Sequence, residues 1–150
     1  MNTAARMQNI TRSIAQLEKS MQRLKRSWDA CSHISDISDL SEADYDALEA
    51  MAGRFSRTSD ILIQKVFRSL DAYELYESGT PLDVINRADK RELFDDVNAI
   101  KRIRALRNRI AHEYELEDLA ILMREMLALT PVLLDTCTRT IEYAMNIIRS

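Results

Sequence analysis

The chain has 150 residues, of which 46% are hydrophobic and 30% are charged, and its formal net charge is −3. This length predicts one domain, residues 1–150, that can bury a substantial core. The net charge excludes a global positive field, so any site for a polyanion must be local. Only two glycines and two prolines occur, and because sheets need many turns, this composition favours an all-helical fold.

The two cysteines, Cys31 and Cys137, lie far apart in the sequence and do not have the spacing of metal ligands. We therefore expect buried thiols in a reducing cytosol in preference to a disulfide or a zinc site. The N-terminal residues contain no apolar signal-peptide segment, and no apolar run approaches the length of a membrane span. The sequence predicts a cytoplasmic protein that needs no membrane, metal ion or cofactor.

An apolar stripe predicts a first helix over about residues 3–33. The residues of this stripe recur in steps of four and three: Ile10, Ile14, Leu17, Met21, Leu24, Trp28 and Cys31. The charged residues on the other face of this helix are most simply a solvated face. The following residues 34–41 are rich in Ser and Asp and are expected to form a connection.

A second long helix is expected to follow Ser41. This serine and Asp44 have the spacing of a capping box, in which the third helical position is acidic. We expect the helix to end near Ser78, with Gly79 as the C′ residue. Gly53 lies inside this helix at a cost of about 1 kcal/mol relative to Ala, which close helix packing would justify.

Two further helices are expected between about residues 80 and 112. Thr80 followed by Pro81 predicts the start of a short helix that reaches about Arg87. Asp89 is then expected to begin a helix that runs to about His112.

The last part of the chain repeats the same cap-and-proline signal. A helix is expected to begin near Asp118, and Thr130 with Pro131 then predicts either a kink or a restart before a helical end near Ile148. No convincing strand is visible. The sequence therefore predicts an antiparallel bundle of four to five helices.

The segment 101–109 holds five cations in nine residues. On a helix, Arg104 lies one turn from Arg107 and Asn108, and Asn108 lies one turn from His112. This helix would therefore display a cationic surface that ends in an imidazole. We expect three cations of this segment to bind phosphate: Lys101, Arg104 and Arg109.

An arginine close to a histidine can cleave a phosphodiester without a metal ion. In RNA the 2′-hydroxyl can attack its neighbouring phosphate if one group accepts its proton and another protonates the leaving oxygen. Histidine titrates near neutrality and transfers protons, and arginine stabilises charge on phosphate oxygens. By chance, an Arg-x4-His match is expected roughly 0.2 times in this chain, and roughly 0.007 times when Tyr must also follow. The alternative to catalysis is a structural role, in which the arginine is an ordinary surface residue and the histidine stabilises the C-terminus of the helix.

The residues RNRIAHEY, positions 107–114, resemble the R-x4-H motif of the HEPN domains, in which a polar residue often follows the arginine. The helical content is also similar, and the tyrosine two residues after the histidine resembles the toxin branch that is paired with minimal nucleotidyltransferases. The resemblance implies a metal-independent endoribonuclease that acts as a homodimer with a composite site. It implies that Arg107 and His112 are catalytic, that Asn108 supports them, and that the antitoxin adenylylates Tyr114.

Three hypotheses for the function remain at this point. The first is an RNA-cleaving toxin with a nucleotidyltransferase antitoxin as its partner. The second is a non-catalytic HEPN-like module that binds a nucleotide or a nucleotidyltransferase. The third is a helical interaction protein in which the motif is accidental.

Overall fold

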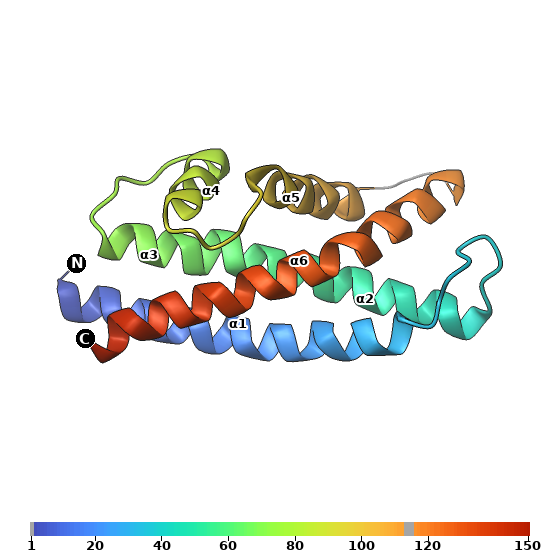
Figure 1. Ribbon diagram of the computed structural model, residues 1–150, viewed down its shortest axis with the longest axis horizontal. Coiled ribbons are helices and arrows are strands. Elements are labelled where there is room, and N and C mark those ends of the chain that lie inside the picture. Colours follow the sequence, from blue (N-terminus) through green and yellow to red (C-terminus); the bar gives the residue numbers. More distant parts are fainter. Residues whose placement is uncertain (1, 113–115) are drawn as a thin grey trace.

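The computed structural model describes residues 2–112 and 116–150, with the side chains of 116–118 left aside (Figure 1). Over these residues the chain forms helices and no strands, which confirms the all-α bundle. Two long rods run antiparallel, and α6 lies across both, so that the two termini meet at one end (Figure 1). The elements are α1 (Thr3–Cys31), α2 (Glu42–Asp60), the π-helix η1 (Ile61–Phe67), α3 (Arg68–Tyr73), α4 (Pro81–Lys90), α5 (Val97–Ala111) and α6 (Leu116–Arg149).

The hairpin of α1 and the α2–η1–α3 rod is held by polar bonds as well as by apolar packing. Three buried serines lie seven residues apart on α1 and face the second rod. Each bonds across the interface: Ser27 accepts from Arg54 Nη1 (2.9 Å), Ser20 pairs with Thr58 (2.7 Å) and Ser13 donates to Ser69 (3.4 Å). Because small side chains with satisfied hydroxyls occupy this seam, the two helices approach closely and their register is defined.

The second rod begins as predicted but contains a π-helix that the sequence did not indicate. Ser41 caps α2 by accepting a hydrogen bond from the Asp44 amide at 3.1 Å, which confirms the predicted start. After Asp60 the backbone bonds become those of η1, and five of its seven side chains are buried. A π turn is wider than an α turn and frequently lies at functional sites. Here η1 packs against α1 and α4.

The prediction that this helix ends near Ser78 with Gly79 as C′ was wrong. The helix ends at Tyr73, and Leu75 takes the left-handed position with φ 67°. The amides of Leu75 and Tyr76 then bond to earlier carbonyls in the pattern of a Schellman motif. Gly79 is needed for another reason: a Cβ there would lie 2.8 Å from Oδ2 of Asp83.

The carboxylate of Asp83 belongs to the capping box of α4. This capping box confirms the predicted helix start at Thr80 and Pro81. However, α4 continues to Lys90, so Asp89 does not begin the next helix. Leu93 and Phe94, which suggested helix by their spacing, are buried in a non-helical connection. The next helix, α5, begins at Val97 because Asp96 accepts a hydrogen bond from the Asn98 amide.

The C-terminal helix α6 runs past Pro131 in one piece, so the chain does not restart there. Proline has no amide hydrogen, and its presence removes one backbone bond of the helix. Thr130 precedes it and donates its hydroxyl to the carbonyl of Met126 at 2.7 Å. Packing of α6 against α1, α2 and α5 holds the helix together across this point.

A buried ion-pair cluster fixes the end of the bundle near the termini. Asp71 accepts from Arg87 at 3.0 Å and from Arg91 at 2.7 Å, and the side chains of Asp71 and Arg91 are only 6% and 4% exposed. Arg91 also donates to Glu74, which accepts from the Tyr143 hydroxyl of α6. These bonds connect α3, α4 and α6.

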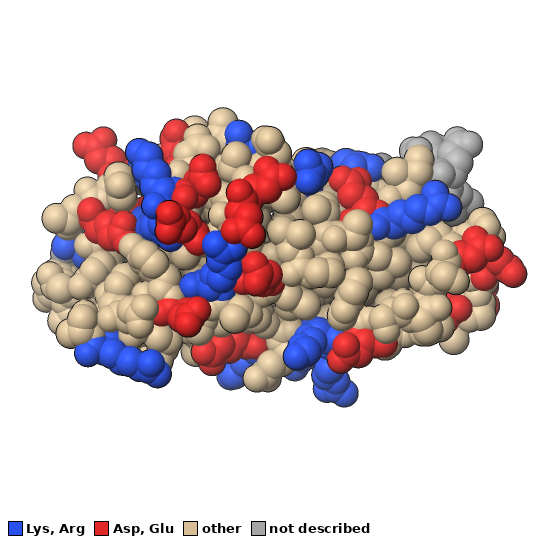
Figure 2. All heavy atoms as spheres, viewed as in Figure 1, with Lys and Arg blue, Asp and Glu red and all other residues tan. Residues whose placement is uncertain are grey.

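The face that carries α6 shows charges of both signs (Figure 2). Lys and Arg side chains lie beside Asp and Glu side chains there, and the surface over the middle of α6 is largely uncharged. In the part of the chain that the structure describes, no helix is both long and apolar enough to cross a membrane. Both cysteines are buried free thiols, as predicted.

Candidate functional site

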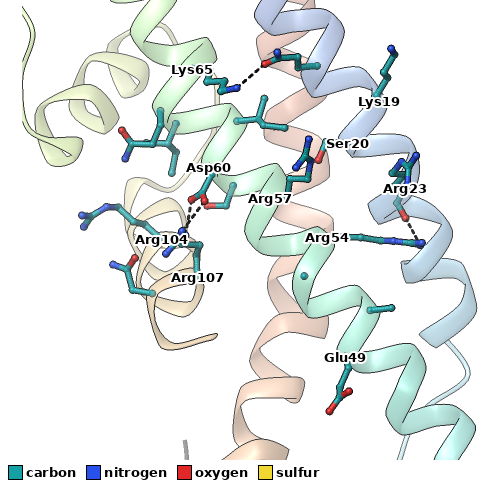
Figure 3. Close-up of a pocket in the computed structure, with 18 residues that line it drawn as sticks. Lys19, Ser20, Arg23, Glu49, Arg54, Arg57, Asp60, Lys65, Arg104 and Arg107 are labelled. Carbon is teal, nitrogen blue, oxygen red and sulfur yellow. Dashed lines mark hydrogen bonds and ion pairs between the residues drawn. The ribbon is translucent and has the colours of Figure 1, made fainter. Parts of the chain in front are cut away.

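A groove of about 1320 Å³ lies on the side of the α2–η1 rod that faces away from α6. The rod forms its floor, and α1 and α5 flank it (Figure 3). Seven of the lining residues are cationic and two are acidic, Glu49 and Asp60. The cations come from all of these elements: Lys19, Arg23, Arg54, Arg57, Lys65, Arg104 and Arg107. The groove is therefore a local positive site on a chain whose net charge is negative.

The closest charge contact in the groove joins Arg107 of α5 to Asp60 at the end of α2. Nε of Arg107 donates to Oδ1 of Asp60 at 2.7 Å, and Nη2 donates to Oδ2 at 2.8 Å (Figure 3). The hydrogen bonds to this carboxylate raise the pKa of Arg107 above its ordinary value. The side chains of Arg107 and Asp60 are 32% and 43% exposed, so a ligand in the groove can reach both.

Two further cations of the groove have partners within the protein. Arg54 extends from α2 to α1, where Nη1 donates to the carbonyl of Arg23 at 3.2 Å and to Ser27. Lys65 of η1 donates to Gln16 of α1 at 3.2 Å. Both bonds hold α1 against the rod and so fix the shape of the groove.

The remaining cations of the groove are available to a ligand. Among the described residues, the side chains of Lys19, Arg23, Arg57 and Arg104 form no hydrogen bond or ion pair. Lys19, Arg23 and Arg57 are exposed, and Arg104 is half-buried. Since none of these charges is neutralised by a neighbour, the groove favours an anionic occupant.

The structure divides the predicted site residues into two groups. Arg104, Arg107 and Asn108 line the groove. The exposed Lys101 does not line it, and Arg109 points to α6, where Nη1 donates to Glu125 at 2.7 Å. The predicted phosphate-binding cations therefore do not share one surface.

His112 is the C-cap residue of α5, with an extended backbone (φ −98°, ψ 158°) and an exposed side chain. Its amide donates to the carbonyl of Arg109 at 3.2 Å. The imidazole thus stands at the open end of α5 and is not part of the groove lining. Tyr114, the predicted site of adenylylation, lies outside the described residues.

Sequence reasoning missed the α1 and α2 side of the groove. The sequence pattern assigns Lys19 and Arg23 to a solvated helix face, and Arg57 belongs to no motif. One signal was present: Gly53 stands inside α2, where it costs stability. Close packing does not explain it, because a Cβ on Gly53 would meet nothing within 4 Å. It is exposed and belongs to the groove lining.

The groove can hold an anion through hydrogen bonds and charge. Its lining on α5 reaches Asn108, and α5 ends four residues later at the exposed His112. Over the described residues, no three His, Cys, Asp or Glu side chains are grouped to hold a metal ion. The chain matches no family model, and no curated protein or solved structure matches it.

Proposed function

We propose that this protein is a metal-independent endoribonuclease of the HEPN type, which acts in the cytoplasm as the toxin of a toxin–antitoxin pair. One observation carries the proposal. Arg107 and Asn108 of the R-x4-H-x-Y segment line a cation-rich groove, and His112 stands exposed at the end of the same helix. An RNA phosphate in the groove would meet guanidinium donors close to a group that transfers protons.

The proposed reaction is a transesterification within RNA. The 2′-oxygen attacks the neighbouring phosphorus, so that a 2′-O–P bond forms while the bond from phosphorus to the 5′-oxygen breaks. The products are a 2′,3′-cyclic phosphate and a 5′-hydroxyl. One imidazole accepts the 2′-hydroxyl proton, and a second acid protonates the departing 5′-oxygen. Arg107 stabilises the negative charge that accumulates on the phosphate oxygens.

A homodimer would supply two copies of His112 for these two proton transfers. The commonest oligomers have two-fold symmetry, which places identical residues around one axis. In this proposal the axis passes near the C-terminal end of α5 and both Arg107 side chains face one composite site. Light scattering at micromolar concentration tests this part, and a monomeric mass contradicts it.

The proposed antitoxin is a nucleotidyltransferase that adenylylates Tyr114. An AMP group two residues past His112 would place a phosphate near the cations of α5 and compete with RNA there. Co-expression with a nucleotidyltransferase encoded beside this chain, followed by intact-mass measurement, tests the modification. An unmodified mass, or a Tyr114→Phe protein that is neutralised as fully as the wild type, would show that inhibition proceeds by binding alone.

A second candidate function is a non-catalytic module that binds a nucleotide or a nucleotidyltransferase. The observation in its favour is that Arg107 already holds Asp60 in two hydrogen bonds, while His112 does not line the groove. A protein of this kind would use the cations for binding and would perform no proton transfer.

Cleavage of RNA in the presence of EDTA separates these two functions. We expect the wild-type protein to cleave, and we expect Arg107→Ala and His112→Ala to be inactive. Helical content should stay unchanged in both, and stability should change little, because His112 is exposed and the ion pair of Arg107 is partly open to solvent. His33→Ala is the matched control, because His33 is also exposed and hydrogen-bonds only Asp44 among the described residues. Activity that persists in His112→Ala, or that EDTA removes from the wild type, contradicts the ribonuclease proposal.

A further inference from the structure

The groove extends beyond the part that the proposed cleavage reaction needs. Its volume of about 1320 Å³ is larger than a typical small-molecule site of about 300–1,000 Å³. Arg104 and Arg107 flank it from α5, whereas Lys19 and Arg23 lie across the rod on α1 (Figure 3). The groove therefore has room for a chain of several groups, with cations on both sides of the rod.

The charge of the lining selects an anionic occupant. Seven cations and two carboxylates give the lining a net charge of +5, although the whole chain carries −3. One of the two carboxylates, Asp60, is already bound to Arg107. Cations that line a concave surface reinforce one another's potential, and an anion that enters relieves their mutual repulsion.

Gly53 supplies an independent indication that this surface is kept open. A glycine inside a helix lowers stability, and nothing in the packing requires one here because the space around its missing Cβ is empty. Gly53 belongs to the part of the groove lining that α2 supplies, and α2 lies between α1 and α5 (Figure 3). A larger side chain at this position would project into the groove.

The remaining lining residues indicate which part of a nucleic acid would be recognised. The groove is lined by no Phe, Tyr, Trp or His among the described residues, and its apolar members are the small Ala50 and the isoleucines Ile61 and Ile63. Bases are usually held by stacking on aromatic rings, which this groove does not offer. Guanidinium and ammonium groups bind phosphate oxygens without regard to the base.

We propose that the groove binds the phosphodiester backbone of RNA, and that Lys19, Arg23 and Arg57 hold phosphates several nucleotides away from the one at Arg107. The ligand class rests on the proposed function, but the inference concerns binding and not cleavage. It assigns to α1 and α2 a substrate-binding role that the R-x4-H-x-Y segment does not include. Binding through these residues is independent of base sequence.

Fluorescence anisotropy with a labelled single-stranded RNA tests this inference in the His112→Ala background, where the RNA stays intact. The groove variant is Arg23→Glu with Arg57→Glu. The matched control is Lys25→Glu with Arg26→Glu, which makes the same charge change at exposed positions of α1 outside the groove. We expect the groove variant to weaken binding about tenfold and to reduce the slope of log affinity against log salt by about 1.4. The control pair is expected to change the affinity less than twofold.

A second variant tests the groove without changing its charge. Gly53→Phe places a ring where a Cβ has free space, so we expect a folded protein, verified by circular dichroism, with reduced RNA affinity. Inorganic polyphosphate serves as a competitor, and RNA must displace it from the groove.

The inference is overturned if both charge variants weaken binding equally, if neither does, or if polyphosphate binds and RNA does not. Failure of the wild-type protein to cleave RNA would instead contradict the proposed function and leave this binding result unaffected.

Discussion

Arg107 and Asp60 face each other across α5 and the end of α2 in a two-bond ion pair, with distances of 2.7 and 2.8 Å. The carboxylate occupies the pair of guanidinium donors that a phosphate would otherwise bind. An anion that reaches Arg107 through the groove must therefore share or displace Asp60. The pair thus restrains the arginine that the proposed chemistry requires.

Asp60→Asn is expected to tighten the binding of single-stranded RNA about threefold, because it removes one negative charge and releases Arg107. Stability is expected to change by less than about 1 kcal/mol, since both side chains are partly exposed to solvent. Anisotropy titration and urea unfolding measure the two effects. Asp95→Asn is the control, because it removes the same charge from an exposed partner of Arg139 outside the groove. Equal tightening in both variants would mean that only net charge matters.

Leu75→Gly is expected to stabilise the protein by up to about 1 kcal/mol. Leu75 has φ 67° and is 73% exposed, so it bears the cost of a left-handed conformation with little packing in return. Urea unfolding gives the free energy. Leu82→Gly provides the comparison, because Leu82 is also exposed but lies in the first turn of α4, where glycine is expected to destabilise. A loss of stability in Leu75→Gly would refute this account of the turn.

Asp71→Asn is expected to destabilise the protein by about 3–5 kcal/mol, because it leaves the buried charge of Arg91 without its closest partner. Arg91 is only 4% exposed, and its Nη1 already has no hydrogen-bond partner among the described residues. Thermal and urea unfolding measure the loss. Asp135→Asn is the control at an exposed carboxylate, for which a change below about 1 kcal/mol is expected. Similar losses in the two variants would show that burial of Arg91 is not decisive.

The free energy of unfolding is expected to fall as the pH rises above 9.0, the ordinary pKa of a cysteine thiol. Burial raises the pKa of Cys137 in the folded protein, so its stabilising contribution is complete below pH 9.0 and is lost at higher pH, where the thiol ionises only in the unfolded chain. The slope from this thiol is about 1.4 kcal/mol per pH unit. Urea unfolding between pH 8 and pH 10.5 measures it. A Cys137→Ala protein with an equally steep decline would contradict this assignment.

The ends of helices were predictable where a side chain makes the cap. Ser41 and the Thr80–Pro81 pair mark their helices because the stabilising bond is local in sequence. The predictions based on Gly79 and Asp89 were wrong because other contacts decide those ends. The helix before Gly79 ends early because the chain turns at Leu75. The helix expected from Asp89 begins later because Leu93 and Phe94 are buried in a non-helical connection.

The site was predictable only along α5. The spacing of Arg104, Arg107 and Asn108 places them on one helix, and the structure brings all three to the groove. The opposite side of the groove comes from α1 and α2, whose cations approach α5 only through tertiary packing. No local pattern distinguishes Arg23 or Arg57 from an ordinary solvated face, and the Asp60 partner of Arg107 lies 47 residues away.

The π-helix η1 makes the second rod tolerant to a change in chain length at one place. A π turn contains about one residue more than an α turn, so η1 resembles an α-helix that has accepted an insertion. Deletion of one residue between Ile61 and Phe67 would let the rod close to α geometry while α2 and α3 keep their buried faces. Elsewhere in the rod the same deletion would rotate everything beyond it by about 100°. The cost of closing η1 would appear in the groove, where Gln64 and Lys65 would be displaced from the surface that they line.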